Sequence, residues 1–314
     1  MNKITVIGTG YVGSTIAYTL TVMGIASDIV LIDINNDKAL GEAIDIKQGT
    51  PYCSPCSINA GSYPDAAGSD IVIITSGVAR KPGQTRLDLA QININILNSI
   101  TPEITKYAPD AMYIIVSNPV DILTYVFCKR SGLPEEHIIG SGTILDTSRL
   151  RSRLSDHYNI NQKNVHAYVL GEHGDSSFIP WSMVNISNVP IREFSESLEY
   201  QGKTYPPLDL AELEMSVRQS GSKVIGLKGA TFYAISMAVC HICQCLLSSV
   251  DMSMPISTML HGEYGIDDVC LSIVNVIGKR GVEGKILLPL TDAEVALLHK
   301  SADKLKETLR SVDY

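Results

Sequence analysis

A glycine-rich turn between a strand pattern and a helix pattern constrains this chain more than any other feature. Residues 3–7 form a short β-branched run, Gly8-Thr9-Gly10-Tyr11-Val12-Gly13 follows it, and apolar residues recur at helical spacing from 14 to 23. A second apolar run, 28–32, ends at Asp33, twenty residues after Gly13. Strand, glycine turn, helix and a later acidic residue predict a dinucleotide-binding βαβ unit.

Each position of this motif has a physical role in holding a dinucleotide. Gly8 makes the tight turn, Gly10 lets the backbone approach a pyrophosphate, and Gly13 allows close packing of helix against strand. Val12 lies in the same motif, and the phosphates are expected at the helix N-terminus. Asp33 can accept hydrogen bonds from a ribose diol and would repel a 2′-phosphate. We therefore expect NAD rather than NADP as the cofactor.

The alternation of strand and helix patterns predicts the fold class. Further strand-like runs are 57–60, 70–75 and 112–116, with a helix pattern over 87–107. Strands that alternate with helices indicate an α/β fold, a Rossmann doubly wound parallel sheet, which we assign to residues 1–142. Ligands bind at the carboxyl ends of the strands in such a sheet.

Residues 143–314 follow a less regular pattern. The expected elements are a helix at 145–158, a strand at 165–169, a helical region at 208–247 interrupted near 220–221 and 226–229, strands at 256–261 and 269–277, and a helix at 292–309. This half is predicted to be a C-terminal α+β substrate domain.

Three sets of polar residues could carry chemistry. His173 lies between two glycines after the run 165–169, where an imidazole can exchange a proton with a substrate, although a lone histidine is more often an ordinary loop residue. Asp146 and Arg149 share one face of a predicted helix, either as a local ion pair or as partners of His173 and of a substrate carboxylate. Asn118 follows a strand, where it either contacts a ligand or forms an Asx turn.

The segment 77–86 contains two glycines, a proline and three basic residues, Arg80, Lys81 and Arg86. Its composition fits an ordinary charged surface loop, but its position after a strand end favours a lid that closes over an anion.

Composition excludes several classes of function. A net charge of −8 and scattered basic residues argue against a nucleic-acid partner, and no apolar run of eighteen residues is present to span a membrane. The N-terminus shows no signal-peptide pattern, so a cytoplasmic protein is expected. The seven cysteines are expected to be free thiols, and the pair Cys53 and Cys56 lacks the further ligands of a metal site.

Five motifs, in order along essentially the whole chain, resemble those of the lactate/malate dehydrogenase family: Gly8–Gly13, Arg80–Arg86, Ser117–Pro119, Gly142–Arg149 and Gly171–Asp175. The resemblance implies NAD-dependent, reversible hydride transfer at C2 of an L-2-hydroxy acid. It assigns His173 as the general acid and base and Asp146 as the residue that holds its imidazole. It assigns Arg149 to the substrate carboxylate and Arg86 to the substrate carbonyl, with Asn118 as a nearby hydrogen-bonding residue in contact with both substrate and cofactor.

Two residues favour different substrates. Thr231 is the residue that lactate enzymes of the family place opposite the substrate side chain, whereas Arg80 stands where malate enzymes carry arginine and lactate enzymes usually carry glutamine. An arginine facing a methyl group in a closed site would be an unpaired charge, at a cost of roughly 2–5 kcal/mol. This argument favours malate and oxaloacetate, with lactate and pyruvate as the alternative.

Arg151 and His166 occupy positions that, in similar bacterial lactate dehydrogenases, line a fructose 1,6-bisphosphate site between subunits. The resemblance therefore implies a homotetramer, with a dimer as the alternative, and a possible allosteric anion site. A solvated arginine and an ordinary strand histidine explain the pair equally well. Two other classes of function compete with the dehydrogenase: a non-enzymatic NAD-sensing module, which would not need Asp146, Arg149 and His173 together, and an NAD-dependent glycosidase, which would need a metal.

Overall fold

The computed structural model describes residues 2–79, 85–198 and 205–314. In this part of the chain the helices are α1 (Tyr11–Val22), α2 (Asn36–Gly49), α3 (Arg86–Tyr107), α4 (Val120–Ser131), α5 (Ile144–Tyr158), α6 (Ile191–Ser197), α7 (Leu210–Lys228), α8 (Tyr233–Leu247) and α9 (Asp292–Arg310). The strands are β1 (Lys3–Ile7), β2 (Asp28–Ile32), β3 (Ser57–Ala60), β4 (Ile71–Ile74), β5 (Met112–Ile115), β6 (Ile138–Gly140), β7 (Val165–His166), β8 (Asn185–Ile186), β9 (Val189–Pro190), β10 (Met252–His261), β11 (Asp267–Gly278) and β12 (Gly281–Ile286).

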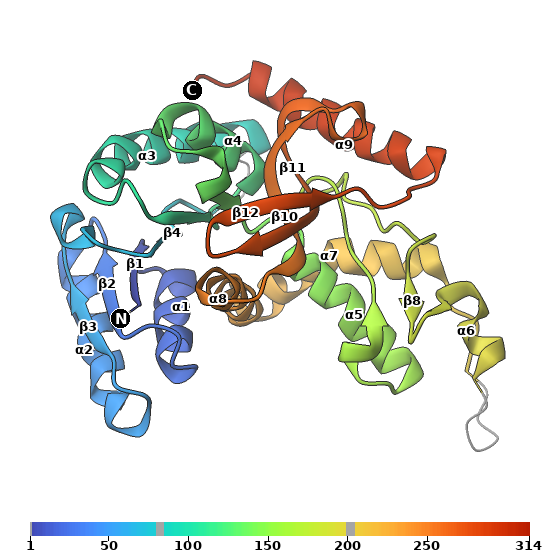
Figure 1. Ribbon diagram of the computed structural model, residues 1–314, viewed down its shortest axis with the longest axis horizontal. Coiled ribbons are helices and arrows are strands. Elements are labelled where there is room, and N and C mark those ends of the chain that lie inside the picture. The colour runs from blue at the N-terminus through green and yellow to red at the C-terminus, as the bar shows by residue number, and fades with distance from the viewer. Residues whose placement is uncertain (1, 80–84, 199–204) are drawn as a thin grey trace.

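A nine-stranded sheet runs through the described residues in the order β12-β11-β10-β6-β5-β4-β1-β2-β3 (Figure 1). Strands β1 to β6 pair in parallel, in the order expected of a doubly wound dinucleotide-binding sheet. The predicted α/β Rossmann fold class is thus confirmed. Strand β10 pairs antiparallel with β6. Strands from residues after 142 therefore continue the sheet that the first half of the chain begins.

The two faces of the sheet are buried against different helices (Figure 1). Along β4, Val72 and Ile74 pack with α3, α4 and α9, whereas Ile71 and Ile73 pack with α1, α2 and α8. Successive side chains of a strand point to opposite faces, so a continuous apolar run is what a sheet covered on both sides requires.

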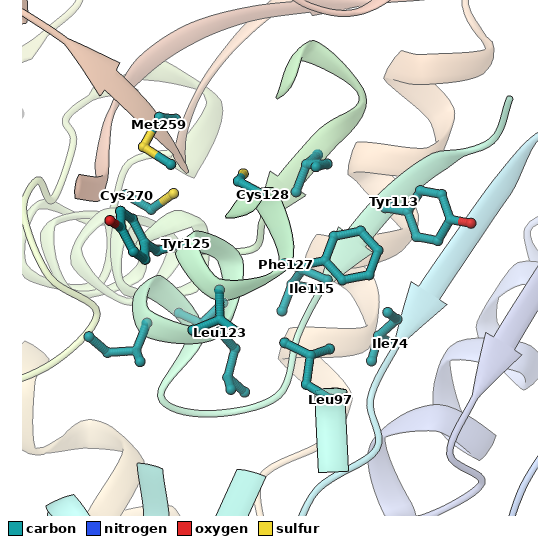
Figure 2. Close-up of a cluster of buried hydrophobic side chains, with 14 of the residues drawn as sticks. Ile74, Leu97, Tyr113, Ile115, Leu123, Tyr125, Phe127, Cys128, Met259 and Cys270 are labelled. Atoms are coloured by element: carbon teal, nitrogen blue, oxygen red, sulfur yellow. The ribbon is translucent and has the colours of Figure 1, made fainter. Parts of the chain in front are cut away.

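Helix α4 lies inside the first of these cores (Figure 2). The rings of Tyr113 on β5 and Phe127 on α4 have centroids 5.0 Å apart, and Leu123, Tyr125 and Cys128 pack in the same cluster. All residues from Val120 to Cys128 are buried, including Asp121. The N-terminal turn of α4 is therefore held rigidly beside the carboxyl end of β5.

A third apolar cluster lies apart from the sheet and joins α5, α6 and α7 to the small sheet β7-β8-β9. It supports α5 and α7 where they border the carboxyl ends of the parallel strands. Among the described residues, no helix is both long enough and apolar enough to cross a membrane.

The structure corrects two of the predicted elements, and it also contains elements, among them α4 and β12, that were not predicted. The expected strand 165–169 is only Val165–His166, because residues 167–170 turn away to bring Leu170 into a bridge with Phe178. The long helical region breaks once, at 229–232, and α7 continues through Ser220 and Gly221. A glycine inside a helix costs only about 1 kcal/mol, and packing overrides it here.

Candidate active site

The glycine turn after β1 forms a cradle that a larger residue would fill. Gly8 has φ +96°, and a Cβ on Gly13 would lie 1.8 Å from the carbonyl oxygen of Gly8. A Cβ on Gly10 would meet nothing within 4 Å, so the space over Gly10 is open. Gly10 is the N-cap residue of α1, and no side chain among the described residues accepts hydrogen bonds from the first turn of this helix. The main-chain N–H groups at this helix end are suited to receive a pyrophosphate, and the turn therefore fits NAD.

Asp33 is fixed beside this turn at the carboxyl end of β2. Its Oδ2 accepts hydrogen bonds from the Thr9 N–H at 2.6 Å and from Thr9 Oγ1 at 2.9 Å, and its Oδ1 accepts one from the Asn35 N–H at 2.9 Å. Burial alone would raise the pKa of Asp33, but these hydrogen bonds hold it below the ordinary value. The carboxylate stays ionised and retains acceptor capacity for a ribose diol.

Helix α5 and the loop after Leu170 bring three predicted residues together. Asp146, in the first turn of α5, accepts a hydrogen bond from Arg149 Nη1 at 2.8 Å, and its other oxygen lies 2.6 Å from His173 Nδ1. The side chains of Arg149 and Asp146 are 15% and 8% exposed, and that of His173 is 25% exposed. His173 therefore reaches solvent-accessible space while its partner carboxylate is buried.

The charges of this cluster support one another. Burial alone would raise the pKa of Asp146, but His173 and Arg149 hold it below its ordinary value. Burial would lower the pKa of His173, but Asp146, with a smaller contribution from Asp121, raises it above the ordinary value. The imidazole therefore holds a proton near neutral pH and can release it to an acceptor.

Main-chain contacts fix the loop that carries His173. Gly171 exchanges hydrogen bonds with Ser272 of β11 at 2.9 and 3.2 Å and has φ +93°. The N–H of Glu172 donates to Ser301 Oγ of α9 at 2.6 Å. A side chain on Gly171 would lie 2.8 Å from Ser301 Oγ, so the tight approach of loop and helix needs glycine here.

A cavity of about 790 Å³ connects this cluster to the start of α1. Its walls include Val12, Asn118, Asp146, Arg149, His173 and Thr231. Asn118 is held through its carbonyl oxygen, which accepts a hydrogen bond from Asn93 Nδ2 at 2.7 Å. Gly8, Gly10 and Gly13, from the turn after β1 and the start of α1, and Asp33, which follows β2, are not among the residues that line the cavity. One cavity is thus lined both by the acid–base pair and by Val12 of the dinucleotide motif.

The structure adds residues of α7 to the cavity that the sequence did not single out: Arg218, Gly221, Ser222, Ile225 and Gly226. Their spacing is helical and would place them on one face, but glycine and serine on that face give no apolar stripe to recognise. A Cβ on Gly221 would lie 3.4 Å from Arg149 Nη2.

The remaining predicted residues lie elsewhere. Arg80 falls outside the described residues, and Arg86 begins α3 but its side chain is not among those described. Arg151 donates from Nε to the carbonyl oxygen of Ala167 at 3.1 Å, and burial holds its pKa below the usual value. His166 is exposed on β7. Within the described part of the chain, no cluster of three or more His, Cys, Asp or Glu side chains could hold a metal ion.

Comparison with known proteins identifies similar sequences along the whole chain. The family model of the lactate/malate dehydrogenase NAD-binding domain matches residues 2–140, and that of the lactate/malate dehydrogenase alpha/beta C-terminal domain matches 143–313. The L-lactate dehydrogenase of Thermoanaerobacterium saccharolyticum is 44% identical over 313 residues, covering 100% of both chains. That of Clostridium botulinum strain Langeland is 46% identical over 98% of this chain and 96% of its own.

Solved structures agree with the sequence comparisons. A lactate dehydrogenase from a Medee basin deep-sea metagenome library superposes with a TM-score of 0.94 at 37% identity, over 100% of this chain and 99% of that one. A minor L-lactate dehydrogenase from Enterococcus mundtii superposes with a TM-score of 0.93 at 37% identity, over 99% and 98% of the two chains.

Proposed function

The chain belongs to the lactate/malate dehydrogenase family and is an NAD-dependent 2-hydroxy acid dehydrogenase, and we propose that its reaction is the interconversion of pyruvate and L-lactate. The observation that carries this proposal is the one cavity that is lined by the hydrogen-bonded cluster of His173, Asp146 and Arg149 and also by Val12 and Asn118. Full-length relatives named L-lactate dehydrogenase support pyruvate as the substrate, as does Thr231 in the cavity wall.

We assign each residue a part in pyruvate reduction. When bound, NADH supplies the hydride that forms the new C–H bond at C2 of the keto acid. Asp146 holds Nδ1 of His173, which leaves Nε2 to give its proton to the substrate oxygen as the C=O π electrons move onto that oxygen. Lactate oxidation returns the proton to His173.

Arg149 is suited to bind the substrate carboxylate. Its Nη1 is engaged by Asp146, which fixes the plane of the guanidinium and leaves Nη2 facing the small residue Gly221. A planar fork of N–H donors matches a carboxylate better than an ammonium group does. By resemblance, Arg86 polarises the substrate carbonyl.

Arg80 favours a second candidate, malate and oxaloacetate. If Arg80 faces the substrate in a closed site, a second carboxylate would pair with it, and the cost of roughly 2–5 kcal/mol for leaving it unpaired would disfavour pyruvate by about 30-fold or more. If Arg80 points to solvent, that cost disappears.

Steady-state kinetics with both keto acids separates the two candidates. We expect wild type to have a higher kcat/KM for pyruvate than for oxaloacetate, and Arg80→Gln to change the ratio by less than about tenfold. Lys81→Gln is the matched control, because it removes one charge from the same segment. A preference of wild type for oxaloacetate that Arg80→Gln reverses, and Lys81→Gln does not, would contradict pyruvate and establish malate.

We further propose an anion site near Arg151 and His166 that takes fructose 1,6-bisphosphate. Support comes from the resemblance and from the partial burial of Arg151, whose guanidinium also lies 5.5 Å from the ring centroid of Tyr168. The sugar bisphosphate should lower the half-saturating pyruvate concentration in wild type and not in Arg151→Gln. The same half-saturation with and without the effector, at every pH tested, would remove this proposal.

We also propose that the protein is a cytoplasmic homotetramer. Tyr18 of α1, Leu40 and Ile44 of α2 and Met237 of α8 are apolar side chains between 47% and 63% exposed, as expected of surfaces that a second copy covers. All seven cysteines are free, as expected in a reducing compartment. Sedimentation equilibrium should give four chains per particle, and a monomer mass would contradict the proposal.

A further inference from the structure

Asp121 is a buried carboxylate for which the reaction above has no use. It lies in the N-terminal turn of α4, 2% exposed, in the otherwise uncharged buried run from Val120 to Cys128. Taking a carboxylate out of water costs several kcal/mol unless specific partners compensate. Helix α4 is packed into the core through Leu123, Tyr125 and Phe127 (Figure 2), so Asp121 is held in this buried setting by its own helix.

Both oxygens of Asp121 have partners from other parts of the chain. Oδ2 accepts the main-chain N–H of His173 at 2.7 Å, and Oδ1 accepts the hydroxyl of Ser257, on β10, at 2.6 Å. The carboxylate therefore connects α4 and β10 to the residue that we assign as the proton donor.

The charges around His173 come from α5, from α4 and from its own loop. Asp146 and Arg149 of α5 face it, Glu172 lies in its own loop, and Asp121 comes from α4. Glu172 is paired with Lys304 of α9 at 3.2 Å. Asp146 is likewise paired with Arg149, whose Nη1 lies 2.8 Å from Asp146 Oδ1.

Asp121 differs from these two carboxylates in its charge balance. Within the described part of the chain, no lysine or arginine forms an ion pair with Asp121. Burial raises the pKa of Asp121 to about 6, against the effect of the hydrogen bonds from Ser257 and His173. At neutral pH and above, its negative charge is present, and no arginine or lysine of the described residues is paired with it.

We propose that Asp121 is a positioning residue for the acid–base step: its hydrogen bond fixes the main chain of His173, and its charge favours the protonated imidazole. The inference rests on the proposed role of His173 in proton transfer. It assigns a function to a carboxylate of α4 that is not among the residues lining the cavity.

Asp121→Asn separates the charge from the hydrogen bond. An asparagine Oδ1 can still accept from the His173 N–H, and its amide can donate to the Ser257 hydroxyl, so the buried contacts are retained. Asp110→Asn makes the same chemical change at an exposed position and is the matched control.

Pyruvate reduction needs the protonated imidazole, so kcat/KM falls as pH rises through the pKa of His173. Loss of the negative charge at Asp121 lowers that pKa. In Asp121→Asn we therefore expect the fall of kcat/KM at alkaline pH, the alkaline limb of the pH profile, to move to lower pH by about one unit. At a pH above the pKa of His173 in both proteins, kcat/KM of the variant should be about tenfold lower than that of wild type. This difference in kcat/KM should vanish below about pH 6, where Asp121 in wild type becomes neutral. Asp110→Asn should follow wild type throughout.

An unchanged alkaline limb in Asp121→Asn, even with a lower kcat/KM, would overturn the proposal, because a merely structural role lowers the rate without moving the limb. A second measurement uses wild type alone and needs no activity. In protein labelled at the histidine rings, the NMR signal of His173, assigned by its loss in His173→Gln, should show a second inflection near pH 6 from Asp121.

A single inflection would overturn the proposal even if the variant fails to fold. If wild type reduces no 2-oxo acid, the proposed function fails, and the NMR titration still tests the coupling of Asp121 to His173.

Discussion

Replacing Asp146 by asparagine should slow pyruvate reduction by a factor that grows as pH rises. The carboxylate accepts from His173 Nδ1 at 2.6 Å, and hydrogen bonds to charged groups contribute about 1.5–3 kcal/mol. At about 1.4 kcal/mol per pKa unit, Asp146→Asn should lower the pKa of His173 by about 1–2 units. At a pH above both values, the protonated fraction then falls about 10- to 100-fold.

Two further effects act at every pH. An asparagine can present its amide N–H to Nδ1 and favour the wrong tautomer, and Arg149 loses its partner at 2.8 Å. Initial rates of NADH oxidation with pyruvate, measured from mildly acidic to alkaline pH, should show a deficit that widens as pH rises. Asp156→Asn, an exposed change on the same helix, is the control. A deficit that stays constant across pH would refute the charge argument, since geometry alone would then explain it.

Three other variants test the cofactor and substrate contacts. Gly13→Ala should weaken NADH binding at least about tenfold in a fluorescence titration, because the new Cβ would lie 1.8 Å from the Gly8 carbonyl oxygen; an unchanged Kd contradicts the assigned turn. Asp33→Ser should lower the preference for NADH over NADPH by about tenfold or more, measured as a ratio of kcat/KM values, and an unaltered ratio would show that Asp33 does not select the ribose. Arg149→Lys should raise the KM for pyruvate at least about tenfold with less effect on NADH binding, since a point charge replaces a planar fork; an unchanged KM would place the carboxylate elsewhere.

The sequence predicted the parallel strands β1 to β5 because their composition leaves little choice, whereas β6, with only three residues, was not predicted. Runs such as Ile71–Ile74 are apolar at every position, as a strand covered on both faces must be. Helix α4 was not predicted, because all its residues from Val120 to Cys128 are buried and the helix therefore shows no amphipathic stripe. Strand β12 was missed because Gly281, Glu283 and Gly284 obscure its pattern.

The candidate site was predictable only in part from local patterns. The Asp146 and Arg149 pair follows from helical spacing, but the approach of His173, twenty-seven residues beyond Asp146, depends on how the loop is fixed to Ser272 and Ser301. The resemblance supplied that pairing, and the structure gives its geometry. Asp121 had no sequence pattern to mark it, because its contacts to His173 and Ser257 join segments that lie 52 and 136 residues away.

The central claim is that His173 supplies the proton for keto-acid reduction in a preformed NAD site. Its most direct test measures NADH oxidation with pyruvate, together with NADH affinity, in wild type and in His173→Gln. The account predicts that the variant loses about 10²- to 10⁴-fold in kcat/KM while its Kd for NADH stays within about twofold of wild type. A variant that retains its rate to within about tenfold at saturating NADH would contradict the assignment.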